Sequence, residues 1–250
     1  MVLHIISVGG SLIVPDEIDV SFIKEFKDLI LKRVEKGDRF ILVCGGGKIC
    51  RKYQKALDDL SDLGDLGDLD GDNNEDKDWL GISVTRLNAE FIRLVFKDIA
   101  YKNVVENPNF KIEFDSNGGG KDGSRNGSSD EKKVLVACGW KPGCSTDKNA
   151  VLLAENFKAK SIINLSNVDY VYSEDPKKNP NAKKLKEISW SDFKKLVGDK
   201  WNPGLNMPFD PIASKEASNL GLKVAIINGK NLKSLNRFLD EKEFKGTLIR

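Results

Sequence analysis

Short apolar runs alternate along this chain with longer segments whose apolar residues recur every three or four positions. Five runs are apolar almost throughout and have the length of strands: 4–8, 40–44, 134–138, 161–165 and 224–228. Helical periodicity marks the segments between them: roughly 20–36, 48–60, 79–101, 147–157, 191–197 and 213–220. Strands that are apolar on both faces and alternate with helices are typical of a sheet covered on both sides. The pattern therefore predicts an α/β fold with a mainly parallel central sheet.

Two segments depart from this pattern. Residues 58–78 carry ten acidic residues against one base, Lys77, and residues 115–133 are rich in Gly, Ser, Asn, Asp and Lys. Neither segment has enough apolar residues to fold by itself. We therefore expect 58–77 and 115–133 to be flexible insertions, with a lid or an interaction segment as the alternative for the acidic one.

The composition is that of an ordinary soluble protein, with 40% hydrophobic and 31% charged residues and a formal net charge of +2. A length of 250 residues accommodates one large domain or two closely joined lobes. No apolar stretch approaches the ~18 residues of a membrane span, and the N-terminus lacks the layout of a signal peptide. We expect a cytoplasmic protein with no membrane partner. The lack of a basic stripe interleaved with aromatic residues disfavours nucleic-acid binding.

The histidine and cysteine content excludes several kinds of site. His4 is the only histidine, which removes Ser-His-Asp and Cys-His catalysis. Cys44, Cys50, Cys138 and Cys144 form no C-x-x-C pair, so reduced structural thiols are favoured over a zinc site.

Two glycine-rich turns, each after an apolar strand, are the strongest indication of chemistry. Gly9-Gly10-Ser11 follows one strand, and Gly45-Gly46-Gly47-Lys48 follows another. Glycine lacks a Cβ, so its backbone N–H can approach a phosphate closely, and a helix that begins there adds its positive end. Arg51, one helical turn beyond Gly47, carries a planar fork that suits a phosphate. Two such turns predict two phosphate-bearing ligands held face to face.

The second turn matches neither of the common phosphate-binding motifs. Leu42 and Ile49 stand where a Walker A loop needs its first glycine and its Ser or Thr. Cys50 stands where the dinucleotide fingerprint needs its third glycine. An ordinary tight turn is the alternative reading of either glycine segment alone.

Residues 140–147 form a third segment, in which Pro142-Gly143 sets a turn before a helix. Thr146 or Asp147 is the candidate N-cap of that helix. Asp147 is also a candidate for orienting a lysine or Mg²⁺ beside a transferred phosphoryl group. Ser189 with Asp192 is typical of another helix start.

Two more segments place polar side chains together. In residues 166–176, Tyr172 is a candidate for stacking on a purine, and Asp169 and Asp175 for binding ribose or Mg²⁺, with an ordinary hairpin as the alternative. Thr85 and Asn88 lie three positions apart on one helix face, where they either read a base or contact a neighbouring subunit.

Taken in order and spacing, these segments resemble the amino-acid kinase superfamily, and within it the archaeal-type uridylate (UMP) kinases. Asp210-Pro211-x-Ala213 and a closing Gly246-Thr247 extend the resemblance over nearly the whole chain. It implies a three-layer α/β/α sandwich, phosphorylation of UMP to UDP with ATP and Mg²⁺ in pyrimidine nucleotide synthesis, and a homohexamer. It also implies one domain over 1–250, with an acceptor lobe at about 1–145 and an ATP lobe at about 146–250.

The resemblance carries site roles onto the matching positions and assigns no metal-ligating residue. The expected catalytic residues are Asp147, Arg51 and Lys48. The expected ATP-binding residues are Gly10, Ser11, Gly47, Arg51, Ser166, Asn167, Tyr172 and Asp175. The expected UMP-binding residues are Gly46, Asp78, Trp140, Lys141, Pro142, Gly143, Cys144, Ser145 and Thr146.

The chain departs from the family pattern at two positions. Ser7 stands where many members have a lysine that neutralises the transferring phosphoryl group, and Lys48, Arg51, Lys141 and Lys215 are the bases near the matched motifs. Tyr170 stands where glycine is usual after Asn-Val-Asp. The alternatives are another small-molecule kinase of the superfamily and a non-catalytic nucleotide sensor or storage subunit on the same fold.

Overall fold

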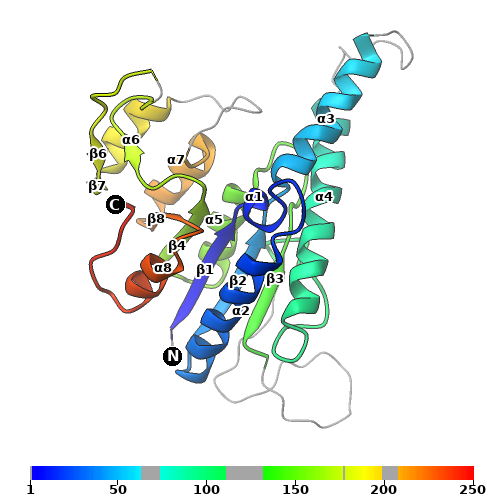
Figure 1. Cartoon of the computed structure of the whole chain (residues 1–250), viewed down its shortest axis with the longest axis horizontal. Helices are drawn as coiled ribbons and strands as arrows, with labels where there is room; N and C mark the ends of the chain where they lie inside the picture. Colours follow the sequence, from blue (N-terminus) through cyan, green and yellow to red (C-terminus); the bar gives the residue numbers. More distant parts are fainter. Residues whose placement is uncertain (1, 63–73, 111–131, 177, 199–207) are drawn as a thin grey trace.

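The computed structural model describes residues 2–62, 74–110, 132–176, 178–198 and 208–250, and its central element is a seven-stranded sheet (Figure 1). The strand order is β3-β2-β1-β4-β8-β9-β7. The strands are β1 (Leu3–Val8), β2 (Arg39–Cys44), β3 (Val134–Ala137), β4 (Ser161–Ser166), β7 (Glu187–Ile188), β8 (Lys223–Asn228) and β9 (Thr247–Ile249). The five strands predicted from apolar runs are all present, and each bound lies within one residue of its prediction.

The sheet is mainly parallel, as predicted. β1 pairs in parallel with both β2 and β4, and further parallel pairs join β2 to β3 and β4 to β8. β9 pairs antiparallel with β8, and β7 pairs in parallel with β9, so these two edge strands run opposite to the other five strands of the described sheet. A separate antiparallel hairpin pairs β5 (Val171–Tyr172) with β6 (Lys184–Leu185). β5 lies in the segment 166–176, for which a hairpin was the alternative. The sequence pattern did not predict β6, β7 or β9, because segments of two or three residues carry no measurable periodicity.

Alternate residues of each central strand point into two separate cores. On β2, Phe40 and Leu42 enter one core, while Ile41 and Val43 enter the other, and all four are fully buried. The first core is completed by α2 (Val20–Glu35), α4 (Asn74–Val95) and α8 (Leu232–Leu239). The second is completed by α5 (Thr146–Asn156), α6 (Trp190–Val197) and α7 (Pro211–Asn219). The molecule is therefore the expected three-layer α/β/α sandwich.

The helices lie close to their predicted positions, with one exception. α4 begins at Asn74 and ends at Val95 rather than spanning 79–101. Glu75 and Asp76 stabilise its start because acidic side chains favour the positive end of a helix. Beyond it, Ala100 pairs with Val134 at the sheet edge, so this part of the chain is no longer helical. As expected, the Ser189 side chain accepts a hydrogen bond from the backbone N–H of Asp192 at 3.1 Å.

The long helices α3 (Gly47–Asp62) and α4 lie side by side and extend beyond the sheet (Figure 1). Both ends of the acidic segment 58–77 are thus helical, and an ion pair joins Lys77 to Asp58 across them. Residues 63–73, and most of the other expected insertion at 115–133, lie outside the described residues. Two short elements, α1 (Gly10–Ile13) and α8, were not predicted. No helix in the described ranges is long and apolar enough to cross a membrane.

Candidate active site

The two glycine turns touch at the carboxyl ends of adjacent strands. β1 and β2 are paired in register up to Val8 and Cys44, so the turns that follow them meet. A Cβ added to Gly10 would lie 2.3 Å from the backbone nitrogen of Gly47, and one added to Gly47 would lie 2.3 Å from the Gly10 carbonyl carbon. Gly47 also has a φ of +66°, in the left-handed region that favours glycine. These glycines are therefore required by the contact between the two turns themselves, before any ligand is considered.

Arg51 bridges the two turns. It lies on α3 and donates from Nη2 to the Ser11 hydroxyl at 3.4 Å. Lys48 is engaged elsewhere, because its ammonium group pairs with the Asp16 carboxylate at 2.8 Å in an exposed position. Of these two basic residues expected to be catalytic, Arg51 is thus the one whose charge lies between the turns.

Asp147 is the carboxylate on which this site converges. It lies on α5 and receives hydrogen bonds from the Ser7 hydroxyl at 3.2 Å, the Asn164 amide at 3.5 Å and the Asp210 backbone N–H at 3.2 Å. Burial, with the nearby Asp210 charge as the second cause, raises the pKa of Asp147 from its ordinary 3.8 to about 7. The Asp210 N–H and Ser7 hydroxyl oppose that rise. Strongly perturbed pKa values are often found at functional sites.

The prediction that Thr146 or Asp147 caps α5 is wrong. Ser145 is the N-cap, with extended backbone angles and a side chain that accepts from the Lys148 N–H at 3.1 Å. A serine hydroxyl in that position satisfies the otherwise unpaired first-turn amide. Asp147 is thereby released from a capping role, and its carboxylate is turned toward β1, β4 and α7.

Asp210 is the second acid beside Asp147, and it is buried. It caps α7 by accepting from the Ala213 N–H at 2.7 Å, and burial raises its pKa. Asp210 belongs to the Asp210-Pro211-x-Ala213 motif, which by itself indicated no role for it. Asn164 was not predicted as a site residue, although an amide side chain inside the mostly apolar run 161–165 could have indicated one.

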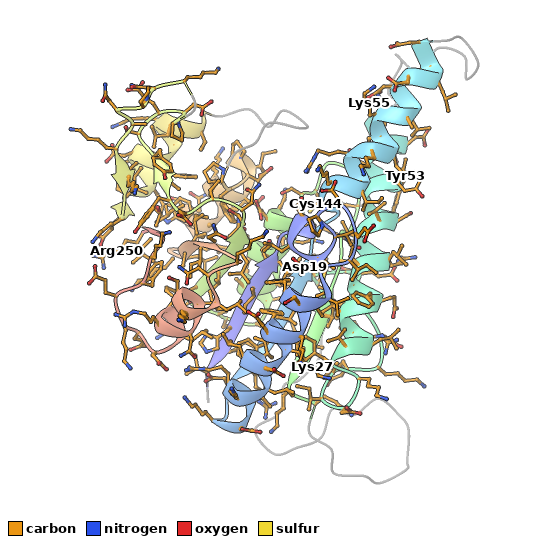
Figure 2. The ribbon with its side chains drawn as sticks, viewed as in Figure 1. Asp19, Lys27, Tyr53, Lys55, Cys144 and Arg250 are labelled. Carbon is orange, nitrogen blue, oxygen red and sulfur yellow. The ribbon has the colours of Figure 1, made fainter. Side chains whose placement is uncertain are left out.

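A cavity of about 120 Å³ lies between the α3–α4 pair and the loop that leads into α5. Five residues expected to bind UMP line it: Asp78, Lys141, Cys144, Ser145 and Thr146. Asp78 ties the two walls together, because its carboxylate accepts from the Gly143 N–H at 2.7 Å. Figure 2 labels Cys144 in this loop, near the end of the sheet. The cavity is also lined by Cys50, Gln54 and Gly81, for which the sequence predicted no site role.

Four other residues expected to bind UMP are not among the cavity-lining residues. Gly46 packs against Cys50, since a Cβ there would lie 2.7 Å from the Cys50 Cβ. The Lys141 ammonium group lies over the Trp140 ring, 4.3 Å from the ring centre, in a cation–π contact. Pro142 and Gly143 form the turn of the loop. Gly46 and Gly143 thus contact residues that line the cavity, Gly143 through its bond to Asp78.

Thr85 and Asn88 share a helix face, as predicted, but their polar atoms bind the backbone. The Thr85 hydroxyl accepts from the Gly139 N–H at 2.8 Å and donates to the Ile82 carbonyl. The Asn88 amide donates to the Gly45 carbonyl at 2.8 Å, and both residues are buried. Asn88 thus holds the second glycine turn on α4, while Thr85 also lines the cavity described above.

The residues expected to bind ATP fall into two groups. Ser166 ends β4 beside the first glycine turn, since the Gly9 N–H donates to the Leu165 carbonyl at 3.0 Å. Asn167 follows it in the same turn. Tyr172 lies on the β5–β6 hairpin, and Asp175 follows in its connecting loop. The turn between the groups is held by Asp169, which accepts from the Asn228 amide at 2.8 Å and pairs with Lys245.

The fold and this geometry define an α/β protein whose two glycine turns meet at the carboxyl ends of parallel strands, the place where ligands bind in open sheets of this kind. Residues 3–228 match the model of the Amino acid kinase family. The chain belongs to this family.

Two relatives that match this chain over most of its length are uridylate kinases. A uridylate kinase of Pyrococcus abyssi is 33% identical over 228 residues, which are 91% of this chain and 90% of the relative. One of Thermococcus sibiricus is 32% identical over 98% of each chain. The crystal structure of a uridylate kinase from Archaeoglobus fulgidus superposes with a TM-score of 0.71 at 30% identity over the full length of both chains. A UMP kinase structure from Bacillus anthracis, at 19% identity and a TM-score of 0.69, shows the shared fold.

Proposed function

We propose that this chain is a nucleoside monophosphate kinase that transfers the γ-phosphoryl group of ATP to UMP and yields UDP. The observation that carries the proposal is the backbone contact of the two glycine turns, with Arg51 between them and Asp147 behind them. The uridylate kinases that match this chain over nearly its whole length support UMP as the acceptor.

The site addresses the main obstacle to such a transfer, which is that both substrates are anions. Two like unit charges ~4 Å apart repel by ~4 kcal/mol at an effective dielectric of ~20. The backbone amides at the starts of α3 and α5 and the Arg51 guanidinium supply positive potential on the donor and acceptor sides. In-line transfer then requires positioning and charge stabilisation and no covalent intermediate.

Asp147 acts in this scheme as a positioning carboxylate. Its three hydrogen bonds come from two strands and from the start of α7, so it fixes these elements relative to the first turn of α5. We assign it to the orientation of basic groups around the transferred phosphoryl group. Ser7, which stands where relatives often have lysine, here donates to Asp147 and supplies no charge.

Mg²⁺ fits this site as a partner of the nucleotide phosphates. Among the described residues, no three metal-ligating side chains gather into a cage. Mg²⁺ is commonly held by one or two carboxylates together with substrate phosphates, and Asp147 is the acid placed for such a role. When bound, the ion would neutralise phosphate charge.

The remaining assignments are proposals that rest on the family. The strands of residues 1–145 form one side of the sheet and those of 146–250 the other, which supports an acceptor lobe and an ATP lobe. Gly10, Ser11, Gly47, Ser166, Asn167, Tyr172 and Asp175 are assigned to ATP. We propose a homohexamer in the cytoplasm that serves pyrimidine nucleotide synthesis. Leu87 and Leu94, 71% and 55% exposed on one face of α4, support self-association.

The experiment that tests the function compares acceptors in one assay. Purified protein with ATP and Mg²⁺ is given UMP, CMP, AMP or acetylglutamate, and nucleoside diphosphate and ADP are measured. We expect UDP formation to exceed turnover of the other acceptors. If acetylglutamate is the preferred acceptor, the chain is instead another small-molecule kinase of this family. Tight binding of ATP and UMP with no turnover would assign a nucleotide sensor.

A further inference from the structure

Gln54 is a carboxamide in the acceptor cavity to which neither the sequence motifs nor the comparisons give a role. It lies on α3 one turn beyond Cys50, and both side chains line the cavity together with Gly81 of α4. Gln54 is half-buried. An uncharged amide in a cavity of this kind offers one acceptor and two donor positions to a ligand.

Gly81 provides the room that the Gln54 amide occupies. A Cβ at Gly81 would lie 3.2 Å from the Gln54 Nε2 and 3.2 Å from the Cys50 Sγ. Glycine weakens the interior of a helix relative to alanine, so a glycine inside α4 calls for a packing reason. The close approach of Gln54 and Cys50 from α3 supplies that reason.

The orientation of the Gln54 amide is determined by its hydrogen bond. Its Nε2 donates to the Lys77 carbonyl oxygen at 3.1 Å. A carbonyl oxygen only accepts, so an inverted amide would place two oxygens against each other. Within the described part of the chain, no residue donates to the Gln54 Oε1. The side chain therefore presents an acceptor oxygen in a fixed orientation.

The cavity has one wall suited to a phosphate and another suited to an uncharged group. Lys141 and the first residues of α5 form the loop wall, where an ammonium group and helix amides attract an anion. The α3–α4 wall around Gln54, Gly81 and Ile82 contributes no basic side chain among the cavity-lining residues, and its one acid, Asp78, accepts from the Gly143 N–H of the loop wall. A nucleoside monophosphate with its phosphate at the loop wall would place its base toward Gln54.

We propose that Gln54 reads the base of the acceptor nucleotide and selects uracil over cytosine. This inference rests on the proposed function. Uracil presents an N–H at N3 beside the oxygen at C4, which matches the Gln54 oxygen and its remaining amide hydrogen. Cytosine presents a lone pair at N3 beside an amino group. It would need the inverted amide, which the Lys77 carbonyl opposes.

The test compares nucleotide binding to the wild type and to Gln54→Met, which keeps the length of the side chain and removes its hydrogen bonds. Dissociation constants of UMP and CMP are measured by calorimetry, alongside kcat and KM. We expect UMP to bind on the order of tenfold to hundredfold more weakly to the variant. CMP affinity and the KM for ATP should change by less than about threefold, so that the preference for UMP largely disappears.

Lys55→Met is the matched control. Lys55 is the next residue on α3, and its exposed side chain, labelled in Figure 2, pairs with Asp59 of the same helix at 2.6 Å. This control should retain the UMP preference of the wild type. Gly81→Ala is a second test of the inference. The added Cβ would crowd the Gln54 amide, so this variant should also show a weaker preference for UMP.

Failure of this inference is distinguishable from failure of the proposed function. Wild-type binding of UMP and CMP with equal affinity, or an unchanged UMP preference in a folded Gln54→Met variant, overturns the role of Gln54 while UDP formation stands. Selective UMP binding that depends on Gln54, without turnover, supports the role and overturns the kinase function. If Gln54→Met does not fold, Gly81→Ala decides. An unchanged preference of that variant for UMP over CMP overturns the role of Gln54.

Discussion

Replacing Asp147 with asparagine is expected to stabilise this protein above neutral pH while it reduces catalysis. The Asp147 pKa is raised from 3.8 to about 7, mainly by burial. A group whose pKa is raised on folding favours the folded state below its unfolded pKa and loses that advantage as the pH rises through its folded pKa. Ionised Asp147 therefore opposes folding at pH 8, and asparagine removes the charge.

The magnitude follows from the two pKa values. A rise from 3.8 to about 7 corresponds to about 4 kcal/mol of unfavourable free energy for the ionised form. Asp147 keeps some solvent contact, which lowers this figure. Asparagine has a single acceptor oxygen. An amide nitrogen at the Oδ1 position would lose the Asn164 bond at 3.5 Å, whereas the Ser7 hydroxyl, which also bonds Oδ1, can turn to accept from it. We therefore expect a net gain of about 1–3 kcal/mol at pH 8.

The assay is urea unfolding of the wild type and Asp147→Asn at several pH values. The variant should be more stable at pH 8, and the difference should shrink as the pH falls toward 4. Turnover should fall by about 100-fold or more, the range seen when a positioned electrostatic group is removed. Asp16→Asn is the control, because Asp16 is exposed and its pKa is lowered by Lys48. A variant less stable than the wild type at pH 8, or a difference that does not change with pH, would refute the reasoning.

Further substitutions test other parts of the structure. Arg51→Ala should lower kcat/KM for both nucleotides by about 10- to 100-fold in steady-state kinetics, and unchanged values would remove Arg51 from the site. Lys48→Ala should have a much smaller effect, because Lys48 pairs with Asp16. Gly47→Ala should destabilise the protein by about 2 kcal/mol or more in urea titrations, because its Cβ meets Gly10. Gly143 has a φ of +71° but open space around a Cβ, so Gly143→Ala should lower the free energy of unfolding by about 1 kcal/mol. Burial lowers the pKa of His4, so His4→Gln should reduce any loss of stability as the pH falls below about 6.5, and equal pH profiles would contradict this.

Much of the candidate site was predictable because its residues follow strands in short, recognisable segments. Apolar runs located the five central strands, and parallel strands bring their carboxyl ends to one edge. The glycine turns, the loop before α5 and Asp147 were therefore assigned together from sequence. The role of Asn88 was not, because its partner is the Gly45 carbonyl, which lies on another element 43 residues away.

The amino-acid sequence by itself determined the periodicity of this protein, its mainly parallel sheet, its family and the order of its polar segments, because these properties depend on residues that are neighbours in the chain. The tertiary structure decided which groups meet. It set Gly10 against Gly47, engaged Lys48 with Asp16 and raised the pKa of Asp147. Burial and backbone contact arise only when distant segments pack, so no local pattern carries them.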